Sequence, residues 1–350
     1  MAKDILQFVQ QQEKQACRNN RRGCIICPGA IGDCLLTLPL AAFMKSAYGL
    51  GGIDFIGRTE YIDFYPGRTA IDGIRSLESI HFHRLFQDAA CFTVEEHDEL
   101  VLAFAAYERI VSFMGFGDPH FESNFIFAAN CTRSADVALL PMADSAGSDR
   151  HVSDFYISAY SSQDESLSHT PAFDPAVRLV KPHARDAEQG RQILESLKVD
   201  SRGRLAVIHP GSGGRSKCWH IQNFKQVAAR LIGDGIQVLF LCGPAEIERI
   251  APDIRSDLAD LAPFVTGTSL TALLQILAWA DGYLGNDSGI SHLAGAMGIP
   301  TVAVFGPTDP RKYRPLGPRV QVVTASASSF VQPAVKDVEI IHEVLARVVG

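Results

Sequence analysis

The sequence carries no excess of positive charge. Lysine and arginine number 32 against 39 acidic residues, giving a formal net charge of −7 over 350 residues. Proteins that bind duplex nucleic acid usually present a strongly basic face, so we expect no nucleic-acid partner. Local basic patches would still allow an anionic substrate or membrane surface. No apolar run approaches transmembrane length, and residues 1–22 lack the apolar core of a signal peptide, so we expect a cytoplasmic protein.

Frameworks built on cysteine are also missing. The eight cysteines show neither disulfide nor zinc spacing, and this usage suits a reducing compartment. Cys24 and Cys27 have CxxC spacing, but they lie in an apolar run that predicts a strand, so we expect buried thiols. No clear cluster of metal ligands stands out, and we expect no metal site.

The chain contains no standard nucleotide-binding glycine fingerprint. The turn at 211–214 lacks the spacing of a P-loop, and its lysine, Lys217, is followed by cysteine. No GxGxxG motif is present either. A P-loop NTPase is therefore weakly supported, and an NAD-dependent oxidoreductase is only a distant alternative.

Strand and helix patterns alternate twice along the chain. In the first half we predict strands at 24–27, 53–57, 108–114 and 136–140, with helices at 34–48 and 95–106. Pro39 within the first helix predicts a kink or a late start. In the second half we predict helices at 188–199, 224–232 and 270–280, strands at 204–209 and 237–241, and a final amphipathic helix at 335–349. This alternation predicts an α/β fold with two doubly wound parallel sheets.

A Ser-, Pro- and Asp-rich stretch at 161–182 is the best candidate for a linker. We therefore expect an N-terminal domain at 1–175 and a C-terminal domain at 183–334. The final helix, about 335–350, could pack back on the first domain.

Residues 284–310 form the most informative stretch. An apolar approach leads into Gly285-Asn-Asp-Ser-Gly289, followed by small apolar residues at helical spacing, a stop at Gly298 and a buried strand at 301–305. Asp287 or Ser288 can cap the helix. The free N–H groups of the first turn and the positive end of the helix dipole would then suit a diphosphate. An ordinary capped turn without a ligand is an equal alternative.

Three loops of the second half would meet if the strands before them are neighbours, because each loop follows the carboxyl end of a strand. They are 212–217, 243–246 and 286–292. In such a pocket Lys217 and Arg215 can neutralise phosphate, Glu246 can bind ribose hydroxyls, and the backbone of 288–290 can cradle phosphate oxygens. Each residue also has a structural alternative: a solvated lysine, a first-turn acid, a cap at Ser212 or a packed His292.

Together these motifs resemble glycosyltransferase family 9, the lipopolysaccharide heptosyltransferases. Gly29-Ala-Ile-Gly-Asp33 with Thr37 and Pro39 is similar to the first signature of the family, and His209-Pro-Gly-Ser212 with Lys217-x-Trp219 to the second. Gly243-Pro-x-Glu246 is similar to the third. Gly285 to Ala294, with Gly298-x-Pro300-Thr301 and Phe305-Gly306, is similar to the most specific one.

The resemblance implies a GT-B type fold, with two Rossmann-like domains facing across a cleft. It implies inverting transfer of a sugar, heptose in that family, from an ADP-sugar to a glycan or lipid-linked glycan of the lipopolysaccharide core. ADP is the product, no cofactor is required, and peripheral contact with the inner membrane surface is allowed. The catalytic aspartate falls on Asp33, the ribose acid on Glu246, and acceptor-side contacts on Gly29, Ala30 and Gly32. Diphosphate and sugar contacts fall on Ser212, Gly213, Lys217, Asp287, Ser288, Gly289, Ile290 and His292.

The chain departs from the family pattern before the first signature glycine. A basic residue and small polar residues are usual there, whereas this chain has Ile26-Cys27-Pro28, and Cys218 replaces a commonly polar residue. Two alternatives stay open: a sugar-nucleotide epimerase or hydrolase of GT-B fold, and a non-catalytic protein that binds nucleotide-sugars or glycans.

Overall fold

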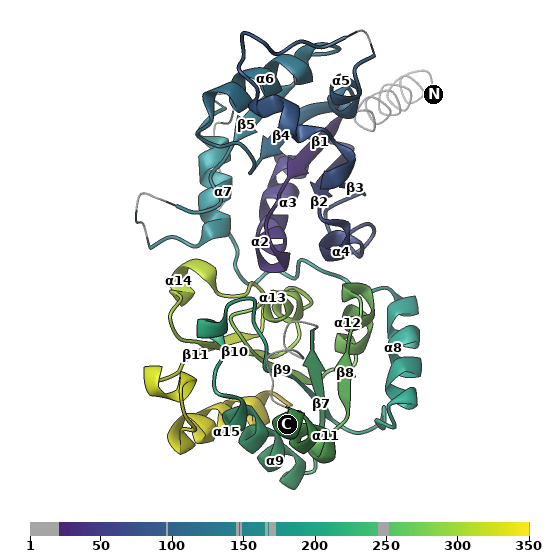
Figure 1. The fold of residues 1–350 in the computed structure, drawn as a ribbon. Helices are drawn as coiled ribbons and strands as arrows, with labels where there is room; N and C mark the ends of the chain where they lie inside the picture. The colour runs from purple at the N-terminus through teal and green to yellow at the C-terminus, as the bar shows by residue number, and fades with distance from the viewer. Residues whose placement is uncertain are drawn as a thin grey trace, which may run out of the picture. The chain divides into compact units, whose positions relative to one another are not determined.

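The computed structural model describes residues 21–95, 97–144, 147, 149–164, 167, 173–243 and 252–349. Glu246 and most of the N-terminal segment 1–22 lie outside these residues. The chain divides into two compact units, Met1–Ser148 with Val152–Phe173, and Asp149–His151 with Asp174–Gly350. The first unit runs from purple to teal in Figure 1, and the second from teal to yellow.

The first unit is a five-stranded parallel sheet with the strand order β3-β2-β1-β4-β5. Four residues of β1, Gly23 to Ile26, are buried, as expected of a parallel strand with both faces of its sheet covered. The strands are β1 Arg22–Ile26, β2 Gly52–Gly57, β3 Gly73–Ser76, β4 Tyr107–Ser112 and β5 Asp136–Leu139. The helices are α2 Ile31–Leu36, α3 Leu38–Ala47, α4 Thr59–Ile62, α5 Glu99–Phe104, α6 Pro119–Asn130 and α7 Val152–Ser161, with short 3₁₀ turns at Leu77–Ser79 and Phe82–Phe86.

The helix predicted at 34–48 is divided at Thr37 into α2 and α3. Pro39 lies in the first turn of α3, where its missing N–H costs no intrahelical bond. The Thr37 hydroxyl donates to the carbonyl of Cys34 at 2.8 Å, which closes the end of α2. The late start predicted from Pro39 is therefore confirmed.

The second unit is a six-stranded parallel sheet with the strand order β11-β10-β9-β6-β7-β8. Its strands are β6 Leu205–His209, β7 Gln237–Cys242, β8 Phe264–Thr266, β9 Gly282–Asn286, β10 Thr301–Phe305 and β11 Val320–Thr324. Its helices are α8 Ala184–Ser196, α9 Ile221–Gly233, α11 Pro252–Leu261, α12 Leu270–Leu277, α13 Gly289–Ala296, α14 Pro310–Tyr313 and α15 Val335–Val349, with 3₁₀ turns at Arg215–Lys217 and Ala327–Phe330. The two parallel α/β sheets expected from the sequence are confirmed.

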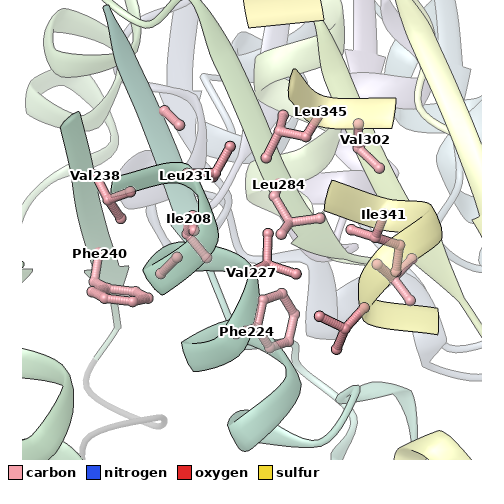
Figure 2. Close-up of a cluster of buried hydrophobic side chains, with 14 of the residues drawn as sticks. Ile208, Phe224, Val227, Leu231, Val238, Phe240, Leu284, Val302, Ile341 and Leu345 are labelled. Atoms are coloured by element: carbon pink, nitrogen blue, oxygen red, sulfur yellow. The ribbon is translucent and has the colours of Figure 1, made fainter. Parts of the chain in front are cut away.

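The core of the second unit includes α15. Its side chains Ile341 and Leu345 are fully buried beside Leu284 of β9 and Val302 of β10, and α9 packs against the same helix. Figure 2 shows Val227 of α9 together with Ile341 and Leu345 of α15 in the same cluster as Leu284 and Val302. The final helix therefore completes the second core, because its apolar stripe packs against these residues. The packing on the first domain that the sequence allowed for this helix stays a prediction.

Each sheet winds outward in both directions from one pair of strands. In the second sheet the chain runs β6-β7-β8 to one side and β9-β10-β11 to the other, so the order reverses between β6 and β9. Open α/β sheets bind ligands at the carboxyl ends of strands at such a switch point. Since His209 lies opposite Gly285 in the register, the loops after β6 and β9 leave the sheet side by side.

Candidate functional site

The turn between β9 and α13 is formed by small and polar residues that pack closely. Ser288 is the N-cap of α13, and its hydroxyl accepts a hydrogen bond from the Ser291 N–H at 3.4 Å. Ser291 in turn donates to the Asn286 carbonyl at 2.5 Å. A Cβ on Gly285 would lie 2.8 Å from the Ser291 hydroxyl oxygen, so only glycine allows this approach. Of the two caps predicted, Ser288 is the one observed.

Asn286 joins this turn to the loop after β6. Its side-chain Nδ2 donates to the Pro210 carbonyl at 2.8 Å, and its side-chain Oδ1 accepts from the Trp219 N–H at 2.8 Å. The residue is completely buried, so these bonds replace those that water would otherwise make. Asn286 therefore fixes the separation of the two loops.

Asp287 is the point at which the loops after β6, β9 and β10 meet. Its Oδ2 accepts hydrogen bonds from the Lys217 ammonium and the Thr308 hydroxyl, both at 2.7 Å. The His292 Nε2 lies 3.8 Å from Oδ1, and the Ser212 hydroxyl donates to the Asp287 carbonyl at 2.7 Å. The predicted convergence of 212–217 with 286–292 is therefore confirmed.

Asp287 is ionised in spite of its burial. Burial alone would raise its pKa, but the neighbouring His292, Lys217 and Thr308 stabilise the carboxylate more and lower the pKa to about 2. The side chain of Asp287 is 6% exposed and that of Lys217 35%, so the pair opens to solvent on the side of the lysine. A ligand can therefore approach Lys217 without moving Asp287.

Two histidines lie beside the α13 cap. His292 is buried, and no hydrogen-bond partner for its Nδ1 exists among the described residues. His209 ends β6, and its Nδ1 is 3.4 Å from the Ser288 hydroxyl. Burial lowers the pKa of His209 to about 4, so it is neutral near pH 7. His292 is the fourth residue of α13, the helix whose N-terminus forms the site.

The remaining residues predicted to form the site in the second unit differ in their exposure to solvent. Gly213 is exposed with open space around it, while Ile290 packs under the first turn of α13 at 7% exposure. Gly289 opens α13 and is partly exposed. Arg215 is exposed on the surface. Glu246 lies outside the described residues, so the role predicted for it stays a prediction.

Asp33 lies in the first turn of α2, at the end of β1. Its Oδ2 accepts a hydrogen bond from the Ala30 N–H at 2.9 Å and so closes the first turn of α2, which also contains Gly32. A Cβ on Gly29 would lie 2.6 Å from the Asp33 Cβ and 2.9 Å from Oδ2. Glycine at position 29 is therefore what lets this carboxylate fold over the loop.

The cysteines with CxxC spacing do not face one another. Cys24 packs with Ile26 in the core cluster of the first unit, whereas the buried Cys27 thiol lies 3.9 Å from that of Cys34 on α2. Residues three apart on a strand point to opposite faces, which explains the difference. The predicted buried thiols are confirmed.

Within the part of the chain that the structure describes, no group of three or more His, Cys, Asp or Glu side chains could hold a metal ion. No helix of these same residues combines the length and the apolarity needed to cross a membrane.

Sequence reasoning missed Thr308 and the roles of Asn286 and Ser291. Thr308 follows β10 in a Gly-Pro-Thr turn, so a polar residue just after a buried strand was a usable signal. Asn286 and Ser291 lay within the stretch singled out. Their hydrogen bonds depend on the neighbouring strand, and the sequence does not give the strand order.

Comparison with known proteins agrees with this geometry. The model of glycosyltransferase family 9 (heptosyltransferase) matches residues 161–339, just over half of the chain. Lipooligosaccharide heptosyltransferase 2 of Haemophilus influenzae is 28% identical over 158 residues, which cover 42% of this chain and 45% of the relative. The matched region therefore spans less than half the length of this curated relative.

Two solved structures share the fold along nearly the whole chain. The glycosyl transferase family 9 protein from Veillonella parvula aligns with a TM-score of 0.68 at 16% identity, covering 94% of this chain and 97% of its own. The E. coli ADP-heptose lps heptosyltransferase II aligns with a TM-score of 0.65 at 17% identity, covering 94% and 98%. The two parallel α/β units are thus those of a GT-B fold, and the chain belongs to glycosyltransferase family 9, the heptosyltransferase family.

Proposed function

We propose that this protein is an inverting glycosyltransferase that moves heptose from ADP-heptose to a hydroxyl of a lipopolysaccharide core or related glycan. The observation that carries the proposal is the junction of Lys217, Asp287 and the N-terminus of α13 at the switch point of the second sheet. The donor and acceptor classes are those in the names of the Haemophilus and E. coli relatives.

The second unit would hold the nucleotide diphosphate. Ser288 caps the Ser291 N–H, and the N–H groups of Gly289 and Ile290 make no hydrogen bond within the described structure. These groups and the helix dipole favour phosphate oxygens at this end of α13. Lys217 is held by Asp287 with its ammonium partly exposed to solvent. Its positive charge would stabilise the negative charge that develops on the leaving diphosphate.

Asp33 would act as the general base. The acceptor hydroxyl oxygen forms a bond to the anomeric carbon while the bond from that carbon to the diphosphate breaks, with inversion. Asp33 takes the hydroxyl proton, and ADP leaves with the bonding electrons. Positioned general bases contribute roughly 10²–10⁴-fold to rate. Gly29, Ala30 and Gly32 shape the loop in which this carboxylate lies.

The proposed reaction needs no metal and no cofactor, because Lys217 and the dipole of α13 supply the charge that a cation would otherwise provide. The acceptor would be a glycan or a lipid-linked glycan. We propose a cytoplasmic location with peripheral contact at the inner membrane surface, where such an acceptor is accessible.

Calorimetric titration with ADP, UDP and GDP tests the donor assignment. We expect binding of ADP in preference to the other two nucleotides, and a preference for UDP would overturn the heptose assignment. Incubation of ADP-heptose with and without acceptor tests the reaction class. Transfer should depend on the acceptor, whereas rapid conversion of the donor alone would favour the epimerase or hydrolase alternative.

A further inference from the structure

The charge of Lys217 is partly balanced within the site. Its ammonium and the buried Asp287 carboxylate form an ion pair at 2.7 Å, so the carboxylate offsets part of the positive charge that a ligand meets at Lys217. A nucleoside diphosphate carries several negative charges, so its binding favours a further cation close to α13.

The loop after β10 runs along α13 and is attached to it at both ends. At the start, the Thr308 hydroxyl donates to Asp287, just before α13 begins. At the other end, a Cβ on Gly295 would lie 2.8 Å from the Leu316 carbonyl oxygen. Gly289, the first residue of α13, and Gly295 are separated by about 9 Å along the helix axis. The loop between these attachments contains α14, and Arg314 directly follows it.

Among the residues that the structure describes, Arg314 is a half-buried cation without a counter-ion. No carboxylate of the described residues forms an ion pair with its guanidinium. Arg311, three residues earlier, differs in this respect: it pairs with Asp149 at 2.7 Å and with Asp309 at 2.8 Å. A partly desolvated guanidinium that lacks a carboxylate is well suited to bind an anion through paired N–H donors.

His151 holds the backbone of Arg314. Its Nε2 lies 3.0 Å from the Arg314 carbonyl oxygen and, in the neutral ring, donates to it. Burial lowers the pKa of His151 to about 4, so the ring is neutral near pH 7. A Cβ on Gly295 would lie 3.1 Å from the Pro315 Cβ, and Gly295 comes about one helical turn after His292 on α13. Arg314, the residue before Pro315, therefore lies beside the face of α13 that carries His292, and His292 lies beside Asp287.

We propose that Arg314 binds the diphosphate of the nucleotide-sugar and that His151 is a positioning residue for it. This assignment rests on the proposed function, and it adds to that function a cation and a support that no signature motif contains. The Arg314 guanidinium would contact phosphate oxygens directly, whereas His151 would act only through the backbone of residue 314.

Calorimetric titration of the full chain with ADP and with adenosine tests the role of Arg314. Arg314→Ala should weaken ADP binding at least about tenfold, which corresponds to ~1.4 kcal/mol, and leave adenosine binding unchanged. The matched control Arg311→Ala removes a cation that is already paired and exposed, and it should change ADP affinity less than about twofold.

Salt titration gives a second measure of the same contact. Because a phosphate contact is screened by ions, ADP affinity should fall less steeply with salt in Arg314→Ala than in the wild type. An Arg314→Ala variant that binds ADP as tightly as the wild type, or that loses adenosine affinity equally, would overturn the assignment. Failure of the wild type to bind ADP would instead overturn the proposed function itself.

His151 is tested by rescue. His151→Phe removes the donor to the Arg314 carbonyl and should weaken ADP binding several-fold, whereas His151→Gln, whose amide can donate, should restore most of the affinity. In the Arg314→Ala background His151→Phe should have no further effect on ADP binding, because it acts through Arg314. An equal loss in both backgrounds would contradict the positioning role.

Discussion

Asp287 shows how a binding residue can also be structural. Its buried carboxylate is stabilised by Lys217 and Thr308, so removing Lys217 alone leaves a buried charge with less compensation. A Lys217→Ala variant would then lose stability as well as a phosphate contact. Nucleotide affinity in such a variant can be interpreted only beside its free energy of unfolding, and Arg314, which has no carboxylate partner among the described residues, offers the cleaner test.

Asp33→Asn should lower transfer by roughly 10²–10⁴-fold and leave ADP affinity unchanged. The asparagine oxygen can still accept from the Ala30 N–H, so the loop should keep its shape while the base is lost. Steady-state transfer rates and calorimetric ADP affinity measure the two effects. An Asp33→Asn variant that turns over at the wild-type rate would exclude Asp33 as the base.

Gly29→Ala tests whether transfer depends on the exact position of the Asp33 carboxylate. Its new methyl group would displace the Asp33 carboxylate without removing it, so we expect a smaller fall in kcat with ADP affinity again unchanged. A fall in kcat as large as that of Asp33→Asn would mean that the loop, and not only the carboxylate, is needed for transfer.

Among the elements, α15 is held in place by the apolar side chains along one of its faces. Leu345→Ala should lower the free energy of unfolding by about 2–5 kcal/mol, because Leu345 is completely buried between α9 and the second sheet. Urea denaturation followed by tryptophan fluorescence measures the change. Ile340→Ala is the control: its side chain is 43% exposed, so its effect should stay within about 0.5 kcal/mol. Equal effects of the two substitutions would mean that α15 does not belong to the second core.

The elements that sequence predicted well have strong local signals. β9, α13 and β10 follow one another with a capping serine, a helix of small apolar residues and a positive-φ glycine at Gly298. By contrast α6 was missed, although Asp118 caps it and Pro119 opens it, because its Phe- and Asn-rich sequence has weak helix propensity. β11 was missed because it is a partly exposed edge strand without a continuous apolar run.

The candidate site was predictable as a set of loops but not as a set of contacts. Each loop was visible as polar residues after a strand, and the resemblance gave them a common role. The pairing of Lys217 with Asp287 needs β6 beside β9, which is a property of the strand order. The hydrogen bond from His151 to Arg314 joins residues 163 positions apart, and no local pattern could have indicated it.

On the scale of the whole molecule, the two units can be observed separately because both tryptophans, Trp219 and Trp279, lie in the second unit. Tryptophan fluorescence should therefore follow unfolding of that unit, while far-UV circular dichroism follows both. If the units unfold independently, the two urea transitions should not coincide.

The second unit should lose stability as the pH falls from about 6.5 to about 4. Burial lowers the pKa of both His209 and His151 from 6.5 to about 4, so in this range the unfolded chain binds protons that the native unit excludes. Each shift corresponds to at most ~3.4 kcal/mol, and the part of the loss that comes from these histidines should level off below pH 4. Below that pH, protonation of Asp287, whose pKa is lowered to about 2, should continue the loss. The urea midpoint of tryptophan fluorescence, measured across this range, should therefore fall with pH.

His209→Gln separates the two contributions, because glutamine does not titrate. This variant should be less stable than the wild type at pH 7, where the His209 contact with Ser288 is lost, but its midpoint should fall less steeply toward pH 4. The slope that remains should come largely from His151. A variant with the full wild-type slope would mean that the native unit accepts a proton on His209, contrary to its burial at the end of β6.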